Sequence, residues 1–368
     1  MKIVIVGAGV AGLSIGWKLA AAGAETVVLE RAQPGGGATW AAAGMLAPTA
    51  ESGMAPEAER DFVSKAMALW PDFAESLEAT SGRNIAFRRD GSLIVAHSTA
   101  EADGLRTRAA ASGGVLVAAD EARTMEPLLA SDIEAALWAP GDAQVDSRAL
   151  GGALTAAFLR AGGTLLANEA VVRIERLAGG RIGARTPFSF HEADTVILAA
   201  GAWTARIEGL PPGAVPPVRP VKGEMIALAM PAGEASPQRL VWGEGIYLVP
   251  RRERLLVGAT VSDVGFDTTL TATARDWLRE RAAALMPGLS NWPLVEHWAG
   301  LRPGSPDGLP LLGATEVEGL YVASGQYRNG ILFAPAIAET MCRLVLEHSR
   351  SPEIAAFDPM RFQNGSVL

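Results

Sequence analysis

Three glycines near the start of the chain have the spacing of a loop that binds the phosphates of a dinucleotide. They belong to the segment Gly7-Ala8-Gly9-Val10-Ala11-Gly12. In such a loop Gly7 permits a tight turn, Gly9 lets the backbone approach a pyrophosphate, and Gly12 lets a helix pack closely on a strand. Glu30 ends the next apolar segment, where its carboxylate can accept hydrogen bonds from an adenosine ribose. The pattern predicts a dinucleotide site; the alternative is a glycine-rich turn in an ordinary α/β domain.

The other residue types that carry chemistry are sparse. The histidines His97, His191, His297 and His348 are not spaced as a metal-binding pair, and no Gly-x-Ser-x-Gly nucleophile motif occurs. The single cysteine, Cys342, excludes an internal disulfide and a cysteine-based metal site. We therefore expect no metal centre. We expect a bound cofactor to supply the chemistry, while the protein supplies position and charge.

Composition and charge exclude several classes of protein. The 368 residues are 49% hydrophobic, enough for a large core, and carry a formal net charge of -8 with a pI near 5.2. An acidic chain has no general affinity for nucleic acid or for an anionic membrane. The apolar start of the chain contains the phosphate-loop glycines and is shorter than the ~20 residues that span a bilayer. We interpret it as a buried strand rather than a signal peptide or a membrane anchor, and we expect a cytoplasmic protein.

The elements that must position the dinucleotide loop are spread over the whole chain. Apolar segments predict buried strands at 2–6, 26–29 and 194–203. A strand at 320–325 leads into a closing helix over 331–348, so the end of the chain completes this sheet. A run of short strands with tight turns between 221 and 260 predicts a second, antiparallel sheet.

This arrangement predicts an α/β fold in which a glutathione-reductase-type FAD-binding Rossmann domain is interleaved with an α+β substrate domain built on an antiparallel sheet. A nicotinamide enzyme usually keeps a compact N-terminal nucleotide domain, whereas a sheet completed by the end of the chain is usual for FAD-binding chains. The expected FAD-binding domain comprises 1–81, 145–215 and 300–368, and the expected substrate-binding domain comprises 82–144 and 216–299.

Three further segments resemble the FAD-dependent D-amino-acid-oxidase family. They are Ala41-Ala42-Ala43-Gly44-Met45-Leu46, Trp298-Ala299-Gly300-Leu301-Arg302-Pro303 with Asp307-Gly308, and Tyr327-Arg328-Asn329-Gly330-Ile331. The first segment is typical of the glycine-oxidase branch, whereas the segment with Arg302 is shared across the family. The resemblance extends over essentially the full chain.

The resemblance implies non-covalent FAD and the oxidation of a small amine that carries a carboxylate. The product would be an imine that hydrolyses to an oxo acid, while O2 takes the electrons as hydrogen peroxide. Glycine is the expected substrate, with sarcosine or a small D-amino acid next. Relatives assemble as homo-oligomers, and the glycine-oxidase branch is connected with the thiazole of thiamine. The resulting set of FAD contacts is Gly7, Gly9, Val10, Ala11, Gly12, Glu30, Ala38, Thr39, Ala43, Gly44, Met45, Val171, Gln326, Tyr327, Arg328, Asn329, Gly330, Ile331 and Leu332.

The same resemblance places the substrate carboxylate against Arg302, with Tyr247 and Arg328 near it. A planar guanidinium binds a carboxylate through two parallel hydrogen bonds, which would fix the substrate Cα–H over the flavin. We expect Arg302 in a stiff loop over 298–310. We expect Arg328 at the start of the closing helix, where the helix dipole disfavours a cation unless an anion compensates. The alternatives are that Arg302 pairs with Asp307, that Tyr247 is a core residue, and that Arg328 is a surface residue.

Other functions stay open at this point. The chain could be a D-amino-acid dehydrogenase that passes electrons to another carrier, or a sarcosine-oxidase-like flavoenzyme. It could also be a flavin-binding protein without amine chemistry. The choice among glycine, sarcosine and small D-amino acids depends on the pocket around Tyr247 and Val261, whose dimensions the sequence does not give.

Overall fold

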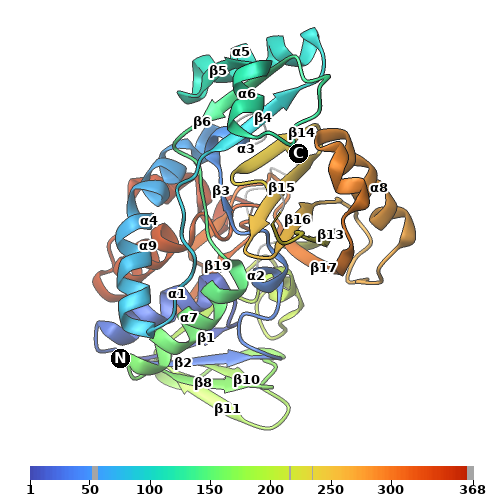
Figure 1. Cartoon of the computed structure of the whole chain (residues 1–368). Helices are drawn as coiled ribbons and strands as arrows, with labels where there is room; N and C mark the ends of the chain where they lie inside the picture. Colours follow the sequence, from blue (N-terminus) through green and yellow to red (C-terminus); the bar gives the residue numbers. More distant parts are fainter. Residues whose placement is uncertain (52–56, 215–216, 234, 363–368) are drawn as a thin grey trace.

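The computed structural model describes residues 1–51, 57–214, 217–233 and 235–362. Two large sheets organise these residues, a six-stranded sheet in the lower part of Figure 1 and an eight-stranded sheet at its right and top. The chain passes between the two sheets several times, so residues far apart in the sequence meet where the sheets face each other.

The six-stranded sheet has the strand order β18-β19-β12-β1-β2-β8. Neighbouring strands are parallel except for β18 and β19. Layers cover both faces, which explains why β1 is an aliphatic, mostly β-branched strand with four buried residues, 3–6. The expected parallel sheet, completed by the end of the chain, is confirmed. The strands are β1 (Lys2–Val6), β2 (Glu25–Glu30), β8 (Thr164–Ala167), β12 (Thr195–Leu198), β18 (Leu311–Ala314) and β19 (Leu320–Ser324).

Four helices pack on one another along one face of this sheet. They are α1 (Val10–Ala21), α4 (Arg60–Ser81), α7 (Ser147–Arg160) and α9 (Ala334–Glu347). The start of α7 is fixed by Asp146, whose carboxylate accepts hydrogen bonds from the backbone N–H groups of Arg148 and Ala149. Against the opposite face lies a small antiparallel sheet of β9 (Arg173–Arg176), β10 (Ile182–Arg185) and β11 (Phe190–Ala193) (Figure 1).

The eight-stranded sheet has the order β17-β13-β16-β15-β14-β4-β6-β5. All of its neighbouring pairs are antiparallel except β14 with β4. Its strands are β4 (Ser92–Ala96), β5 (Val115–Ala118), β6 (Ala135–Ala139), β13 (Arg219–Ala229), β14 (Leu240–Gly243), β15 (Ile246–Arg251), β16 (Arg254–Gly258) and β17 (Leu294–Gly304).

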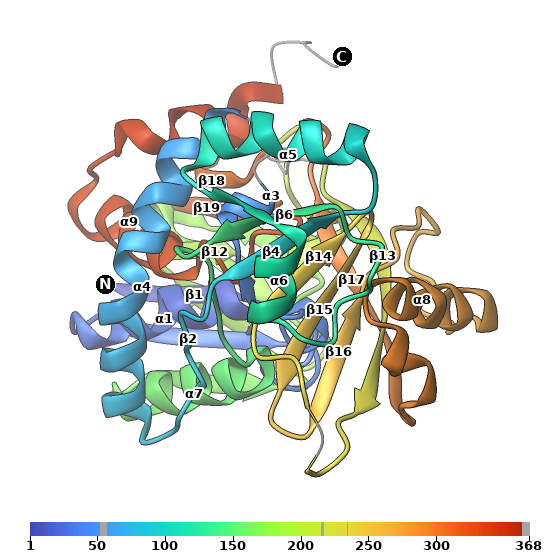
Figure 2. The same cartoon turned by 45° about the horizontal axis from the view of Figure 1, so that its top comes forward.

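Helices cover both faces of the eight-stranded sheet. The side chains of α6 (Ala119–Met125) and α8 (Ala272–Leu285) pack into the core of its outer face. The opposite face packs against α5 (Thr99–Ser112) and against Ala41 and Ala43, so it faces the dinucleotide-binding part of the chain. Figure 2 shows α8 on the side of the sheet that is turned away from α1, α4 and α9.

The remaining elements are short. The pair β3 (Met45–Leu46) and β7 (Ala143–Gln144) forms a two-stranded sheet. Two helices of one turn, α2 (Ala38–Ala41) and α3 (Pro48–Glu51), flank β3. The 3-10 helices are 57–59, 178–180, 201–206, 287–291, 352–357 and 359–362.

One expected element is wrong, and another begins later than expected. Residues 298–304 continue strand β17 and pair with β13 instead of forming a loop. Proline has no backbone N–H to donate to a neighbouring strand. Because β17 is the edge strand of the sheet, Pro303 can be accommodated on the side of β17 that pairs with no further strand. The closing helix α9 begins at Ala334 rather than at 331, so Arg328 precedes it by more than a turn.

The division into two domains stays a proposal. The boundary expected between 215 and 216 lies outside the described residues, and β17 crosses the boundary expected between 299 and 300. No helix in the described ranges combines the length and the apolar character needed to cross a bilayer.

Candidate functional site

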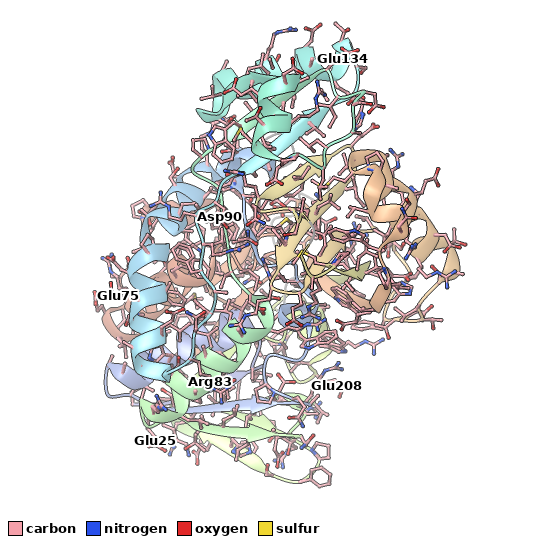
Figure 3. All side chains as sticks on the ribbon, in the orientation of Figure 1. Glu25, Glu75, Arg83, Asp90, Glu134 and Glu208 are labelled. Carbon is pink, nitrogen blue, oxygen red and sulfur yellow. The ribbon has the colours of Figure 1, made fainter. Side chains whose placement is uncertain are left out.

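A cavity of about 1160 Å³ lies where the two sheets face each other. Its lining comes from the carboxyl ends of β1, β2 and β12 on one side and from β13, β15 and β17 on the other. Ligands of open parallel sheets bind at this edge of the strands. Figure 3 shows the two edges: Glu25, the first residue of β2, lies at the amino end, and Glu208, which lines the cavity, lies toward the carboxyl end.

At the dinucleotide end, close backbone contacts require Gly7 and Gly12 to have no side chain. A Cβ at Gly12 would stand 2.0 Å from the carbonyl oxygen of Gly7, and Gly7 itself has a φ of +105°. The carboxylate of Glu30 accepts a hydrogen bond of 2.7 Å from the backbone N–H of Ala8. Glu30 therefore holds the turn and lines the cavity at the same time.

A stack of aromatic rings and guanidinium groups covers the cavity near Glu30. The guanidinium of Arg31 lies 3.5 Å from the ring centroid of Trp203, and Trp203 contacts Phe266 at 5.3 Å between centroids. On the far side Arg206 lies 3.9 Å from the Phe266 ring. Sequence reasoning missed this stack, because its members come from three separate segments that carry no shared motif.

The small-residue segment 41–46 approaches the eight-stranded sheet closely. A Cβ at Gly300 would stand 2.4 Å from the Cβ of Ala41, and the indole N–H of Trp298 donates to the Ala41 carbonyl at 3.0 Å. The buried guanidinium of Arg251 donates to the carbonyl of Ala43 at 2.6 Å. Burial lowers the pKa of Arg251 to about 10, so it is still a cation at neutral pH. These contacts hold the segment as part of the cavity wall.

Arg302 projects from β17 into the cavity and lies across the backbone of β13. A Cβ at Gly223 would meet its guanidinium atoms at 2.3–2.5 Å, so only glycine leaves room for this arrangement. The guanidinium donates to the carbonyl of Thr260 at 3.2 Å, and its charge lowers the pKa of the Tyr247 phenol. The alternative pairing with Asp307 is wrong, because Asp307 pairs with Arg361 at 2.7 Å.

Tyr247 projects from β15 toward the same space. Its hydroxyl lies 3.8 Å from the sulfur of Met225, and Gly258 on the neighbouring strand leaves room for its ring. Burial raises the pKa of Tyr247, against the lowering by Arg302, so the phenol is neutral at physiological pH. Tyr247 can therefore donate a hydrogen bond to a ligand but cannot act as a base there.

The turn before α9 brings Arg328 to the mouth of the cavity. The backbone N–H of Tyr327 donates to the carbonyl of Pro303 at 2.9 Å, which joins this turn to the end of β17. Tyr327 has a φ of +45°, so the chain turns sharply there instead of continuing into a helix. Arg328 is exposed and also lines the cavity, so the two interpretations of its position are compatible.

Most of the predicted site residues meet in this cavity. Gly12 packs under the phosphate loop, Asn329 donates to Glu59 at 2.9 Å, and the carbonyl of Leu332 accepts from Trp70, so these three lie behind the lining. The individual roles stay predictions. The predicted residues that line the cavity are Gly7, Gly9, Val10, Ala11, Glu30, Ala38, Thr39, Ala43, Gly44, Met45, Val171, Tyr247, Arg302, Gln326, Tyr327, Arg328, Gly330 and Ile331.

The cavity also contains features that a bound cofactor would explain. The side-chain nitrogens of Gln326 and Trp242 are buried and have no hydrogen-bond partner in the part of the chain that the structure describes, and both residues line the cavity. Buried donors are usually satisfied, so a ligand with acceptor atoms fits this wall. Within the same described ranges no three His, Cys, Asp or Glu side chains gather as a metal site.

Sequence reasoning also missed Glu51, which lines the cavity from the end of α3. The pKa of its carboxyl is raised to about 7, mainly by burial and to a lesser extent by the charge of Asp142. The charges of Arg328 and Arg302 act in the opposite direction and limit this rise. The one signal in the sequence is a lone acid directly after the small-residue segment. That signal is weak without the fold.

Comparison with known proteins identifies the class. The model of the FAD dependent oxidoreductase family matches residues 2–344. The chain therefore belongs to this family, and the predicted FAD cofactor is confirmed.

Within this family, the chain is similar to glycine oxidases over nearly its full length. A glycine oxidase from Geobacillus kaustophilus is 36% identical over 98% of this chain and 96% of its own length. The crystal structure of glycine oxidase from that organism superposes with a TM-score of 0.90, at 35% identity and 98% coverage of both chains. The Bifunctional protein ThiO/ThiG of Trichormus variabilis is 35% identical over 98% of this chain, which spans 55% of that relative.

A methyl group at position 223 tests the placement of Arg302. We expect Gly223→Ala to fold and to bind FAD, because the displaced atoms are the end of a flexible side chain. The shifted guanidinium should lower kcat/KM toward the amino-acid substrate by about 10²-fold. Steady-state kinetics measure this, with Gly288→Ala as the control, where a Cβ meets no atom within 4 Å. Unchanged kinetics in Gly223→Ala would show that Arg302 does not position the substrate.

Proposed function

We propose that this chain is an FAD-dependent oxidase of glycine. Sarcosine and small D-amino acids are the next substrates. The products are glyoxylate or another oxo acid, ammonia or an amine, and hydrogen peroxide. We also propose a role in making the thiazole of thiamine, a homo-oligomeric assembly and a cytoplasmic location.

One observation carries this proposal: Arg302 and Tyr247 line the same cavity of a member of an FAD-dependent family, and Arg302 lies close enough to Tyr247 to lower the pKa of its phenol. A guanidinium and a phenol together can bind the two oxygens of one small carboxylate. The contact between Gly300 and Ala41 sets this pair beside the small-residue segment 41–46. The relatives that match 98% of this chain are named glycine oxidase, and this name agrees with a substrate of this size.

The residues of the chain would act mainly by orientation. FAD, when bound, accepts the two electrons released from the substrate Cα–H bond. Arg302 would hold the carboxylate and so fix the direction of that bond. Tyr247 would donate to the same group, and Arg328 at the mouth adds positive charge that attracts an amino-acid anion.

Oxygen use separates the proposed oxidase from a dehydrogenase. In air-saturated buffer with glycine, we expect one hydrogen peroxide per glyoxylate, measured with a peroxidase-coupled dye. The same assay with an artificial electron acceptor under argon is the control for catalytic competence. Fast reduction of that acceptor with no peroxide in air would reject the oxidase in favour of a D-amino-acid dehydrogenase.

A further inference from the structure

The backbone directly before Glu51, at the end of the short helix α3, is held by hydrogen bonds from two sides of the chain. The carboxylate of Asp142 accepts hydrogen bonds from the backbone N–H groups of Thr49 at 3.1 Å and Ala50 at 3.3 Å. From the other side the guanidinium of Arg108 donates to the carbonyl of Ala50 at 3.1 Å. The carboxyl group of Glu51 therefore reaches the cavity from a fixed point of the wall.

Charged groups from four other elements act on the Glu51 carboxyl. Arg328, in the turn before α9, and Arg302, on β17, attract the ionised form. Asp142, just before β7, opposes ionisation. Glu59, on the 3-10 helix 57–59, is likewise coupled to Glu51 by charge repulsion. The outcome is a carboxyl group that changes its charge near neutral pH beside two permanent cations.

The other groups near Glu51 are less suited to take a proton from a ligand in the cavity. Asp142, whose pKa burial raises to about 6, does not line the cavity and already accepts hydrogen bonds from Ser92 and from the backbone N–H groups of Thr49 and Ala50. Arg302 and Arg328 carry guanidinium groups, which donate hydrogen bonds and have no acceptor atom for a proton. Tyr247 is a neutral phenol whose pKa burial raises further. Glu59, whose pKa burial raises to about 7, does not line the cavity and accepts a hydrogen bond from Asn329.

The other acids of the cavity are far from this end or already engaged. Glu30 accepts two backbone hydrogen bonds at the dinucleotide end, and Glu101 accepts one from the backbone N–H of His97. Glu244 is exposed in the turn between β14 and β15, and Glu208 lies beside β9. No His, Lys or Cys side chain of the described residues lines the cavity.

We propose that the Glu51 carboxylate takes a proton from the ammonium group of the bound amino acid. This inference rests on the proposed function and adds the step that prepares the amine. Amino acids are zwitterions at neutral pH, and only the neutral amine has the lone pair that oxidation requires. Arg302 holding the carboxylate and Glu51 facing the nitrogen would together select substrates that carry both groups.

The proposed proton transfer precedes the oxidation of the substrate. One N–H bond of the ammonium group breaks and an O–H bond forms on Glu51, which leaves a lone pair on nitrogen. FAD, when bound, would accept the hydrogen and the electron pair of the Cα–H bond, and the nitrogen lone pair would then form the C=N bond of the iminium product. Glu51 is partly exposed, so its proton can return to solvent.

The test compares kcat/KM for glycine from about pH 6 to about pH 10 in four FAD-loaded proteins: the native chain, Glu51→Gln, Glu51→Asp and Glu59→Gln. In the native chain the value should rise through the pKa of Glu51, near 7, and then level off. In Glu51→Gln it should be about 10²-fold lower near neutral pH and rise with the free-amine fraction until it meets the native value at high pH. Glu51→Asp should keep the levelled profile at a lower rate.

Glu59→Gln is the matched control, because Glu59 is a buried acid with a similar pKa that does not line the cavity. It should keep the native plateau rate, since its amide oxygen can still accept the Asn329 hydrogen bond, and its limb should move only slightly to lower pH because the charge repulsion between Glu59 and Glu51 is lost. Acetate, which lacks the amine, gives a readout independent of turnover. The dissociation constant of acetate, measured from the change in the flavin spectrum, should be no higher for Glu51→Gln than for the native protein.

The outcomes separate the two proposals. If the native holoenzyme oxidises no small amine, the proposed function fails. If it oxidises glycine but Glu51→Gln has the native pH profile, only the role of Glu51 fails. If Glu51→Gln loses FAD, Glu51→Asp is the deciding variant. A plateau of kcat/KM equal to the native plateau would overturn the proposal. A lower plateau that still follows a rise of kcat/KM near pH 7 would support it.

Discussion

Arg302→Ala is expected to lower kcat/KM for glycine by about 10²–10³-fold. Removing one member of a desolvated, hydrogen-bonded charge pair costs about 3–5 kcal/mol, because the partner is left without its counter-charge. Here the partner is the substrate carboxylate, and the lost interaction also fixed the direction of the Cα–H bond. Steady-state kinetics on FAD-loaded protein measure the effect.

Arg361→Ala is the matched control for this prediction. Arg361 pairs with Asp307 just beyond the end of β17 and does not line the cavity, so it should affect stability and leave kcat/KM within about twofold. If Arg302→Ala retained native kcat/KM, Arg302 would not be the carboxylate-binding residue. If instead Arg361→Ala lowered kcat/KM by this amount, the activity would depend on the conformation of the chain at the end of β17 rather than on the guanidinium of Arg302.

Gly12→Val is expected to give a protein that purifies without FAD. A Cβ at this position would stand 2.0 Å from the backbone oxygen of Gly7, and backbone cannot move aside as a side-chain end can. The phosphate turn must open, which should raise the FAD dissociation constant by at least about 100-fold, or about 2.8 kcal/mol. Flavin absorbance per protein and titration of apoprotein with FAD measure this.

Gly141→Ala is the control for this change, because a Cβ there meets no atom within 4 Å. Circular dichroism should show that Gly12→Val keeps its helices and strands. A folded Gly12→Val that purified with stoichiometric FAD at native affinity would contradict the assignment of 7–12 as the phosphate-binding turn.

Local features of the dinucleotide turn made it predictable from sequence. The conformation of 7–12 depends on glycines that are neighbours in the chain, and the acid at Glu30 follows at a short separation. The parallel sheet was predictable for the same reason, because strands buried on both faces have apolar runs such as 2–6. For these elements the sequence pattern and the tertiary structure agree.

The segment around Arg302 shows where such reasoning fails. Glycine and proline favour a loop over 298–310, yet 298–304 form a strand because β13 offers a full partner and β17 lies at the sheet edge. Gly300 and Gly223 are required by close contacts with Ala41 and with the guanidinium of Arg302. These are tertiary demands, so composition could not distinguish them from a flexible loop.

Glu51 could not be recognised from the sequence for a related reason. Its place in the cavity depends on hydrogen bonds from the backbone of α3 to Asp142, 92 and 93 positions further along the chain. Its altered pKa arises from burial and from Arg328, which is still more remote in sequence. A property that comes from several distant segments leaves no local pattern.

Anaerobic mixing of the FAD-loaded protein with glycine tests directly whether Arg302 holds the carboxylate of a small amine while the Cα–H bond of that amine is oxidised by FAD. We expect complete bleaching of the visible flavin band with glycine, and at least about 100-fold slower bleaching with methylamine, which lacks the carboxylate. A flavin that stayed yellow with glycine, sarcosine and D-alanine, or that bleached equally fast with methylamine, would contradict the account.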